Sequence, residues 1–264
     1  MNGFAPFLKK EFTESKRTYR AAIMLIVMLF FGIIGPLAAK FLPQMLEMLM
    51  PDNISAEDMG VLNLFMRDPS ALDAWAQYFN NMSQIGIMMI AIMFSGALAS
   101  EAGKGTLIPL LARGLSRPAA VVAKFVCQAS LWTLFYAAAA AVTWGLTSAL
   151  FPAQGYLTPQ LFFSHFGLWL FGIFVLALTL FMSAILKNVI MVLLSMVGSW
   201  FVMAVVTSVY PSSARYNPLT LSTSATNIAA TNQPGFYLPA VLITAALAAA
   251  SLLAAVFAFK KRAL

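Results

Sequence analysis

Residues 162–186 read FFSHFGLWLFGIFVLALTLFMSAIL, and residues 189–210 read VIMVLLSMVGSWFVMAVVTSVY. Neither stretch contains an aspartate, glutamate, lysine or arginine, and only Lys187 and Asn188 separate them. An α-helix needs about 20 mostly apolar residues to cross the hydrocarbon core of a bilayer. Both stretches are long enough, so they predict two membrane-spanning helices joined by a very short turn.

Four further stretches have the same apolar character, at 21–42, 78–99, 125–151 and 237–259. The chain of 264 residues is 61% hydrophobic and 9% charged, whereas a soluble domain has about 25% charged residues. The predicted fold class is therefore an all-α membrane protein with six transmembrane helices. The first stretch is longer than the apolar core of a signal peptide, so we expect it to be retained as a span.

We expect residues 1–264 to form a single transmembrane domain. An amphipathic segment at 1–20 precedes spans one and two in 21–99, which are joined by an outer loop at 43–77. An inner loop follows at 100–124, and spans three to six occupy 125–264.

The placement of basic residues predicts the orientation. If the N-terminus is inside, thirteen of the sixteen lysines and arginines lie on the inner side, and such a bias marks the cytoplasmic side. The three outer ones are Lys40, Arg67 and Arg215. Both termini are thus expected in the cytoplasm, and the net charge of +7 is explained by the membrane rather than by a nucleic-acid partner.

The outer loops differ in composition. Six of the nine acidic residues lie in 43–77, namely Glu47, Asp52, Glu57, Asp58, Asp68 and Asp73. This loop is either a solvated segment with one or two short helices or a vestibule that attracts cations. The loop at 211–236 is rich in Ser, Thr, Asn and Pro, and we expect it to lie near the membrane face, partly re-entrant.

Residues 4–20 predict an amphipathic helix at the membrane surface. At 100° per residue, one arc collects apolar side chains, namely Phe4, Phe7, Leu8, Phe12 and Tyr19. Most of the basic residues fall on the opposite arc, as in helices that lie in the interface plane. Glu11 interrupts the apolar arc, so its carboxylate is expected to have a partner.

The loop at 100–124 contains signals for short helices. Gly114 is suited to end one helix, and Ser116 to cap the next, with Pro118 in its first turn. A short amphipathic helix at about 101–113 would then be held between two spans, although an ordinary inner loop is the alternative. Its leucines would offer an apolar face, with charges from Glu101, Lys104 and Arg113 around it.

This loop resembles the first cytoplasmic loop of the type-2 ATP-binding-cassette exporter permeases. That family's pattern is an acid, Gly-Thr-Leu, two leucines, Ser-Arg and then Lys-Phe. The matching stretches are Glu101, Gly105-Thr106-Leu107, Leu110-Leu111, Leu115-Ser116-Arg117 and Lys124-Phe125. Lys10-Glu11-Phe12 is also similar to the family's elbow helix, whereas Gly114 stands where the family often has proline.

The resemblance implies the permease subunit of a bacterial exporter in the inner cell membrane, which moves an apolar or amphipathic substrate out of the cell. Such a subunit pairs with an identical or homologous permease chain, and each chain docks a separate ATPase subunit that uses ATP and magnesium. The residues implied in docking are Glu101, Gly105, Thr106, Leu107, Leu110, Leu111, Arg113 and Arg117. The alternatives are a membrane-embedded immunity or sensor protein, and a channel or ATP-independent carrier.

Several absences agree with this interpretation. The chain has no Gly-x-x-x-x-Gly-Lys-Ser/Thr sequence, so ATP should be bound by another chain. The predicted spans have no charge near their centres, which argues against ion coupling and against an intramembrane enzyme. No catalytic or metal site is predicted. Candidate cavity residues are the polar ones inside spans, namely Gln84, Ser95, Gln128, Ser195 and Ser199.

Overall fold

The computed structural model describes residues 3–49, 68–112, 114–152, 158–230 and 234–262. Every regular element in these ranges is a helix, and six helical stretches are long and apolar enough to cross a membrane. The predicted all-α membrane fold with six transmembrane helices is therefore confirmed. The spanning elements are α2 (Arg20–Leu49), α4 (Ala71–Asn81) with its continuation α5 (Ile87–Phe94), α8 (Arg117–Leu150), α9 (Pro159–Ile185), α10 (Val189–Val209) and α13 (Leu238–Lys261).

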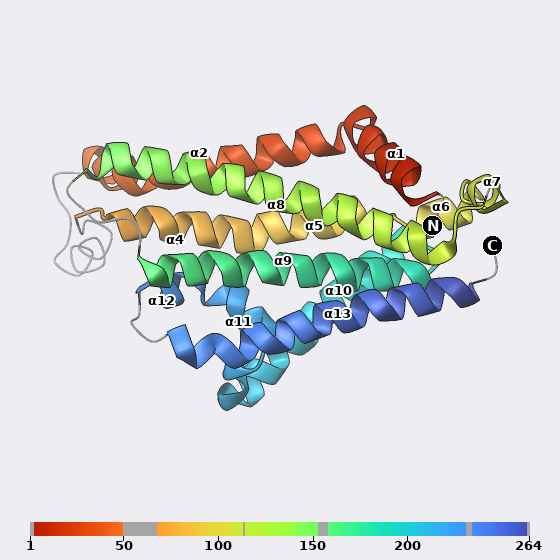
Figure 1. The fold of residues 1–264 in the computed structure, drawn as a ribbon. Helices are drawn as coiled ribbons and strands as arrows, with labels where there is room; N and C mark the ends of the chain where they lie inside the picture. The colour runs from red at the N-terminus through yellow and green to blue at the C-terminus, as the bar shows by residue number, and fades with distance from the viewer. Residues whose placement is uncertain (1–2, 50–67, 113, 153–157, 231–233, 263–264) are drawn as a thin grey trace.

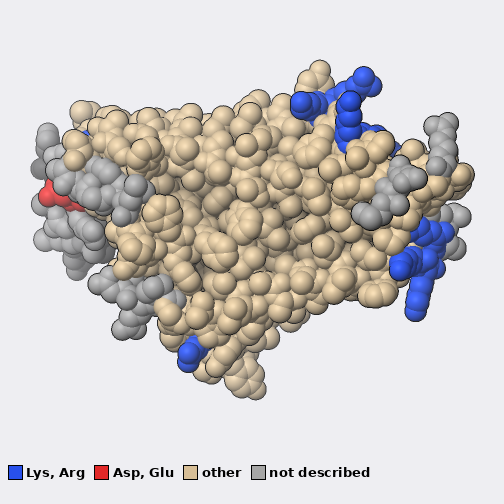
Figure 2. Space-filling view, viewed as in Figure 1, with Lys and Arg blue, Asp and Glu red and all other residues tan. Residues whose placement is uncertain are grey.

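The shorter elements gather at the two ends of the bundle. The helices α1 (Phe4–Arg17), α6 (Ala99–Gly103) and α7 (Ile108–Ala112) lie at the end that carries both chain termini (Figure 1). We call this the termini end. Figure 2 shows that most of the visible lysine and arginine side chains also lie at this end.

Span two begins earlier than its hydrophobicity predicts. The helix starts at Ala71 rather than near residue 78, because Ser70 and Asp73 form a reciprocal capping box at its N-terminus. Ser70 is therefore the N-cap residue, and Asp73 is the N3 residue of the capping box. Span one likewise continues as helix to Leu49, through Pro43. Of the other expected outer acids, Asp52, Glu57 and Asp58 lie outside the described residues.

Helix α9 is the centre of the bundle. In its most apolar 18-residue stretch, 67% of the stretch is buried inside the bundle, against 11% for the corresponding stretch of α10. Of the six spans, α10 therefore has the smallest buried share and leaves the most apolar surface to be covered by lipid or another chain. The approach of α8 to α9 depends on Gly172, because a Cβ atom there would collide with the indole ring of Trp132. Trp132 is fully buried, and its Nε1 donates to the carbonyl of Trp169 at 3.1 Å.

The loop at 211–236 folds back along the bundle. It forms the short helices η2 (Pro211–Arg215), α11 (Pro218–Thr223), α12 (Ala225–Ala230) and η3 (Pro234–Tyr237). Helix α11 lies against α9 and α13 and buries Leu221 and Ser222 (Figure 1). Helix α11 also contacts α10.

Candidate functional site

The N-terminal helix α1 packs on the end of its own bundle. Tyr19, with a φ of 57°, turns the chain sharply between α1 and α2. Four members of the apolar arc then face inward, with Phe7 buried and Phe4, Leu8 and Phe12 half-buried against the core. The fifth, Tyr19, lies beyond the end of α1 and is 71% exposed, so its predicted place on the helix was wrong. Helix α1, the predicted elbow helix, thus packs on the spans through one face and is exposed on the other.

Five charged side chains meet where α1 packs on α6 and α8, and we call them the elbow cluster: Lys10, Glu11, Glu14, Glu101 and Lys124. The Lys124 ammonium is at its centre, with Nζ 2.9 Å from Glu11 Oε2 and 2.9 Å from Glu101 Oε1. Its side chain is only 3% exposed. One ammonium group therefore joins α1, α8 and the start of α6, and it supplies the partner that Glu11 was expected to have.

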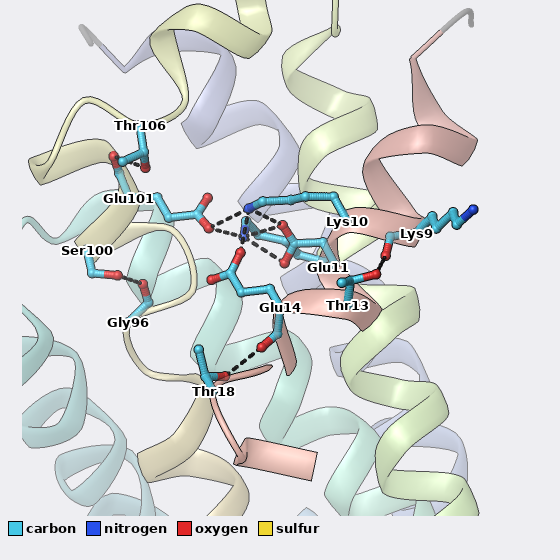
Figure 3. Close-up of polar contacts among 11 residues, drawn as sticks. Lys9, Lys10, Glu11, Thr13, Glu14, Thr18, Gly96, Ser100, Glu101 and Thr106 are labelled. Atoms are coloured by element: carbon cyan, nitrogen blue, oxygen red, sulfur yellow. Dashed lines mark hydrogen bonds and ion pairs between the residues drawn. The ribbon is translucent and has the colours of Figure 1, made fainter. Parts of the chain in front are cut away.

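Lys10 closes the cluster from the solvent side. Its Nζ lies 2.6 Å from Glu14 Oε2, 3.1 Å from Glu11 Oε1 and 3.3 Å from Glu101 Oε1. Figure 3 shows Glu11, Glu14 and Glu101 directed toward this region from two different segments. Burial alone would lower the pKa of Lys10, but Glu14, Glu101 and Glu11 outweigh it and raise the pKa. Burial alone would raise the pKa of Glu14, but its hydrogen bond and ion pair with Lys10 outweigh burial and lower the pKa.

The charge of the elbow cluster is nearly balanced. One carboxylate oxygen from each of the three glutamates lies within 4.8 Å of the others, a spacing that would suit a cation. Two lysine ammonium groups already supply positive charge to these oxygens. Because Glu11 and Glu101 each contact both ammonium groups, these shared ion pairs connect α1, α6 and α8.

The segment from Ala99 to Ala112 contains two short helices rather than the single helix expected at 101–113. The turn between them needs Gly105, which has a φ of +68°. The backbone N–H and the hydroxyl of Thr106 both donate to the carbonyl of Glu101, at 3.1 and 3.3 Å. The Gly-Thr pair of the family-like pattern thus ends one helix and turns the chain into the next.

The end of this segment agrees with the sequence prediction. Gly114 has a φ of +94° after α7, and the Ser116 side chain caps α8 by accepting from Ala119 N–H. Pro118 lies in the first turn of α8. At the other end of the segment, the hydroxyl oxygen of Ser183 in α9 accepts from the N–H groups of Leu98 and Ala99.

The expected docking residues do not share one exposed face. Leu107 is fully buried beside Phe7, and Leu110 and Leu111 are half-buried. Arg117 does not reach the tip, because its guanidinium donates to carbonyls of the C-terminal residues, including Lys260 at 2.9 Å. Arg113 lies outside the described residues. The exposed tip consists instead of Lys104, Thr106, Ile108, Pro109 and Ala112.

The five candidate cavity residues separate in the structure. Ser95, Ser195 and Ser199 donate their hydroxyls to carbonyls of their own helices. Gln128 lines a small cavity of about 40 Å³ next to the elbow cluster, and its Oε1 has no partner among the described residues. Only Gln84 lines a large groove.

That groove, which we call the α4–α10 groove, opens between span two, α9, α10 and α11 and has a volume of about 620 Å³. Span two contributes its wall through a π-helical turn, η1 (Met82–Gly86), a feature that is frequent at functional sites. The lining residues are Asn80, Ser83, Gln84, Met88, Phe171, Val197, Trp200, Phe201, Ala204, Leu219, Ser222 and Thr223.

Comparison with family models and with curated proteins gives no match to this chain. The geometry nevertheless brings together two groups of residues predicted separately, the elbow residues Lys10 and Glu11 and the loop residue Glu101. Lys124 was not among the predicted site residues. Two features of the sequence could have indicated it: Glu11 needs a partner on its apolar arc, and Lys124 is a lone charge at the start of an apolar run.

Proposed function

We propose that this chain is the permease subunit of an ATP-driven exporter in the bacterial inner membrane. In this proposal the termini end faces the cytoplasm, a separate ATPase chain docks on the tip of the α6–α7 segment, and a second permease chain completes the transport path. ATP and magnesium are used by the ATPase chain. The observation that carries the proposal is the connection of an exposed tip to the spans through Lys124.

The connection is suited to transmit force. Force applied to the tip is transmitted along the segment to Glu101. Lys124 connects Glu101 by ion pairs to span three, where Lys124 lies, and to Glu11 of α1. The start of the segment is also connected to α9, because the N–H groups of Leu98 and Ala99 donate to the Ser183 hydroxyl oxygen. A loop without such contacts would bend under the applied force. This segment is instead expected to move together with the helices that it contacts.

The membrane-facing side supports transport and pairing. The α4–α10 groove has a volume within the range of small-molecule sites, about 300–1,000 Å³, and it opens at the largely unburied helix α10. Asn80 and Gln84 are exposed on span two, where lipid would leave their amides without hydrogen-bond partners. A second permease chain facing this side would enclose the groove and cover the amides.

The docking step is tested by pull-down from native membranes with the tip variant Ile108→Asp. Ile108 is 50% exposed, so the variant should insert normally and lose the ATPase chain. The matched control is Thr13→Asp, which places the same charge on the exposed face of α1 at the same end of the molecule. Equal recovery of an ATPase chain by both variants would remove the tip as the docking site.

The energy source is tested in vesicles that contain the chain with its co-purified partners. The expected result is transport that requires ATP and continues after the ion gradients are collapsed. Transport driven by a proton or sodium gradient without ATP would replace the proposal with an ATP-independent carrier. Stable capture of a peptide with no ATPase partner and no transport would instead indicate an immunity or sensor protein.

A further inference from the structure

Among the described residues, those that line the α4–α10 groove carry no ionisable side chain. Eleven of the twelve are amide, hydroxyl, aromatic or aliphatic residues, and the twelfth is Met88, a thioether. At membrane depth a charged ligand would lose its water and find no opposite charge in such a groove, which is strongly unfavourable. The described lining therefore offers no ion-pair partner to a cation or to an anion.

The groove lining offers free hydrogen-bonding groups. The side-chain amides of Asn80 and Gln84 make no hydrogen bond within the described part of the chain, and the buried Nε1 of Trp200 makes none there either. The hydroxyls of Ser83 and Thr223 donate to nearby backbone carbonyls and keep their acceptor capacity. The lining can therefore both donate to and accept from an uncharged ligand.

The other lining residues are mostly apolar, and two of them are aromatic. Phe171 of α9, Phe201 of α10 and Leu219 of α11 line the same space as the indole of Trp200. A wholly apolar occupant such as a lipid chain would match these side chains but would leave the amides without hydrogen bonds. A strongly polar occupant would match the amides but not the rings.

We propose that the α4–α10 groove binds an uncharged amphipathic molecule whose polar part carries hydroxyl or amide groups. This deepens the proposed function by naming the substrate class, and it rests on that function for the direction of transport. The polar part lies against Asn80 and Gln84, and the apolar part lies against the aromatic side chains of α9 and α10.

The test uses three photoreactive amphiphiles that share one alkyl chain and differ in the head group: glucoside, trimethylammonium or sulfate. The full chain is reconstituted in nanodiscs with its co-purified partners, and the labelled peptides are identified by mass spectrometry. The expected result is preferential labelling of peptides from span two and α10 by the glucoside. The double variant Asn80→Leu/Gln84→Leu should reduce this labelling roughly five- to tenfold, as expected for lost hydrogen bonds.

The matched control is Gln77→Leu, which removes an exposed amide from the same helix outside the groove lining and should leave labelling unchanged. Equal labelling by all three amphiphiles would overturn the proposal and indicate a site for lipid chains. A disulfide between two copies carrying Gln84→Cys in a Cys127→Ala background, with no glucoside labelling, would show that a second copy fills the groove. Either result leaves ATPase recovery in the Ile108→Asp experiment unaffected, so failure of the substrate class is distinguishable from failure of the proposed function.

Discussion

At the scale of single residues, Lys124 contributes most to the termini end. Its ammonium is almost fully buried and is paired with Glu11 and Glu101, which come from elements far apart in the chain. A buried charge is tolerated only when it is paired and hydrogen-bonded. The loss of Lys124 removes the buried cation of the cluster and leaves Glu11 and Glu101 with the half-exposed Lys10 alone, which they share with Glu14.

We expect Lys124→Met to destabilise the fold by about 3–5 kcal/mol, the usual effect of removing one partner from a buried ion pair. Thermal unfolding of the detergent-solubilised protein near pH 7 measures the change. Lys9→Met is the matched control, because it makes the same change at an exposed lysine of α1, at the same end of the bundle. Adding Glu11→Gln to Lys124→Met should recover part of the loss, and a Lys124→Met protein as stable as the control would contradict the account of the elbow cluster.

The pair Lys10–Glu14 predicts a pH dependence. The Glu14 pKa is lowered from 4.5, so its contribution is present above that value and disappears as the pH falls through the lowered pKa. The Lys10 pKa is raised above 10.5, so its contribution is present below that value and disappears only at still higher pH. Because Lys10 is 40% exposed, the effect is modest.

Accordingly, Glu14→Gln should lower the unfolding temperature slightly at pH 7 and have less effect as the pH falls below 4.5. Unfolding curves of both proteins across this range provide the measurement. A difference between the two proteins that stays constant down to strongly acidic pH would show that the ion pair does not stabilise the fold.

At the scale of elements, close approach of helices depends on a few small residues. A Cβ atom at Gly172 would meet the Trp132 indole, and one at Gly32 would lie 2.9 Å from the Ala139 carbonyl oxygen. Membrane helices associate through such contacts, because lipid removes the hydrophobic force between them. Other glycines in the spans, such as Gly145 and Gly198, have open space around the Cβ position.

Gly172→Ala is expected to destabilise the protein by about 1–3 kcal/mol through overpacking against Trp132. Gly145→Ala, with the same chemical change in α8 and nothing within 4 Å, should have little effect. Thermal unfolding and gel filtration of the two variants side by side make the comparison. Equal stability of both variants would mean that α8 and α9 can separate without loss, contrary to the packing described.

At the scale of the whole molecule, the segment with the exposed tip and the α12 region lie at opposite ends of the bundle (Figure 1). The basic bias predicts that the termini end lies on the cytoplasmic side. Docking to a cytoplasmic ATPase requires that the tip lie inside, so the orientation is a condition of the proposed function.

Cysteine labelling tests the orientation in cells that express Cys127→Ala, since Cys127 is the one cysteine of the chain. Asn227→Cys should react with a membrane-impermeant maleimide in intact cells. Lys104→Cys, at the exposed tip, should react only after the cells are permeabilised. Reaction of Lys104→Cys in sealed cells would reverse the topology and remove the basis for cytoplasmic docking.

The sequence by itself determined the number and type of the spans, because bilayer thickness sets the length of an apolar helix and the spans satisfy their own backbone groups. It also determined local features such as the Gly114 turn and the Ser116 cap, which depend on neighbouring residues alone. Only the tertiary structure decided that Glu11 meets Lys124, which is 113 residues away, that Leu107 is buried while Ile108 is exposed, and that Gln84 faces a groove. These properties depend on how each helix is rotated and on which helices lie beside it, and in a nearly uniform apolar sequence the hydrophobic pattern does not specify either one.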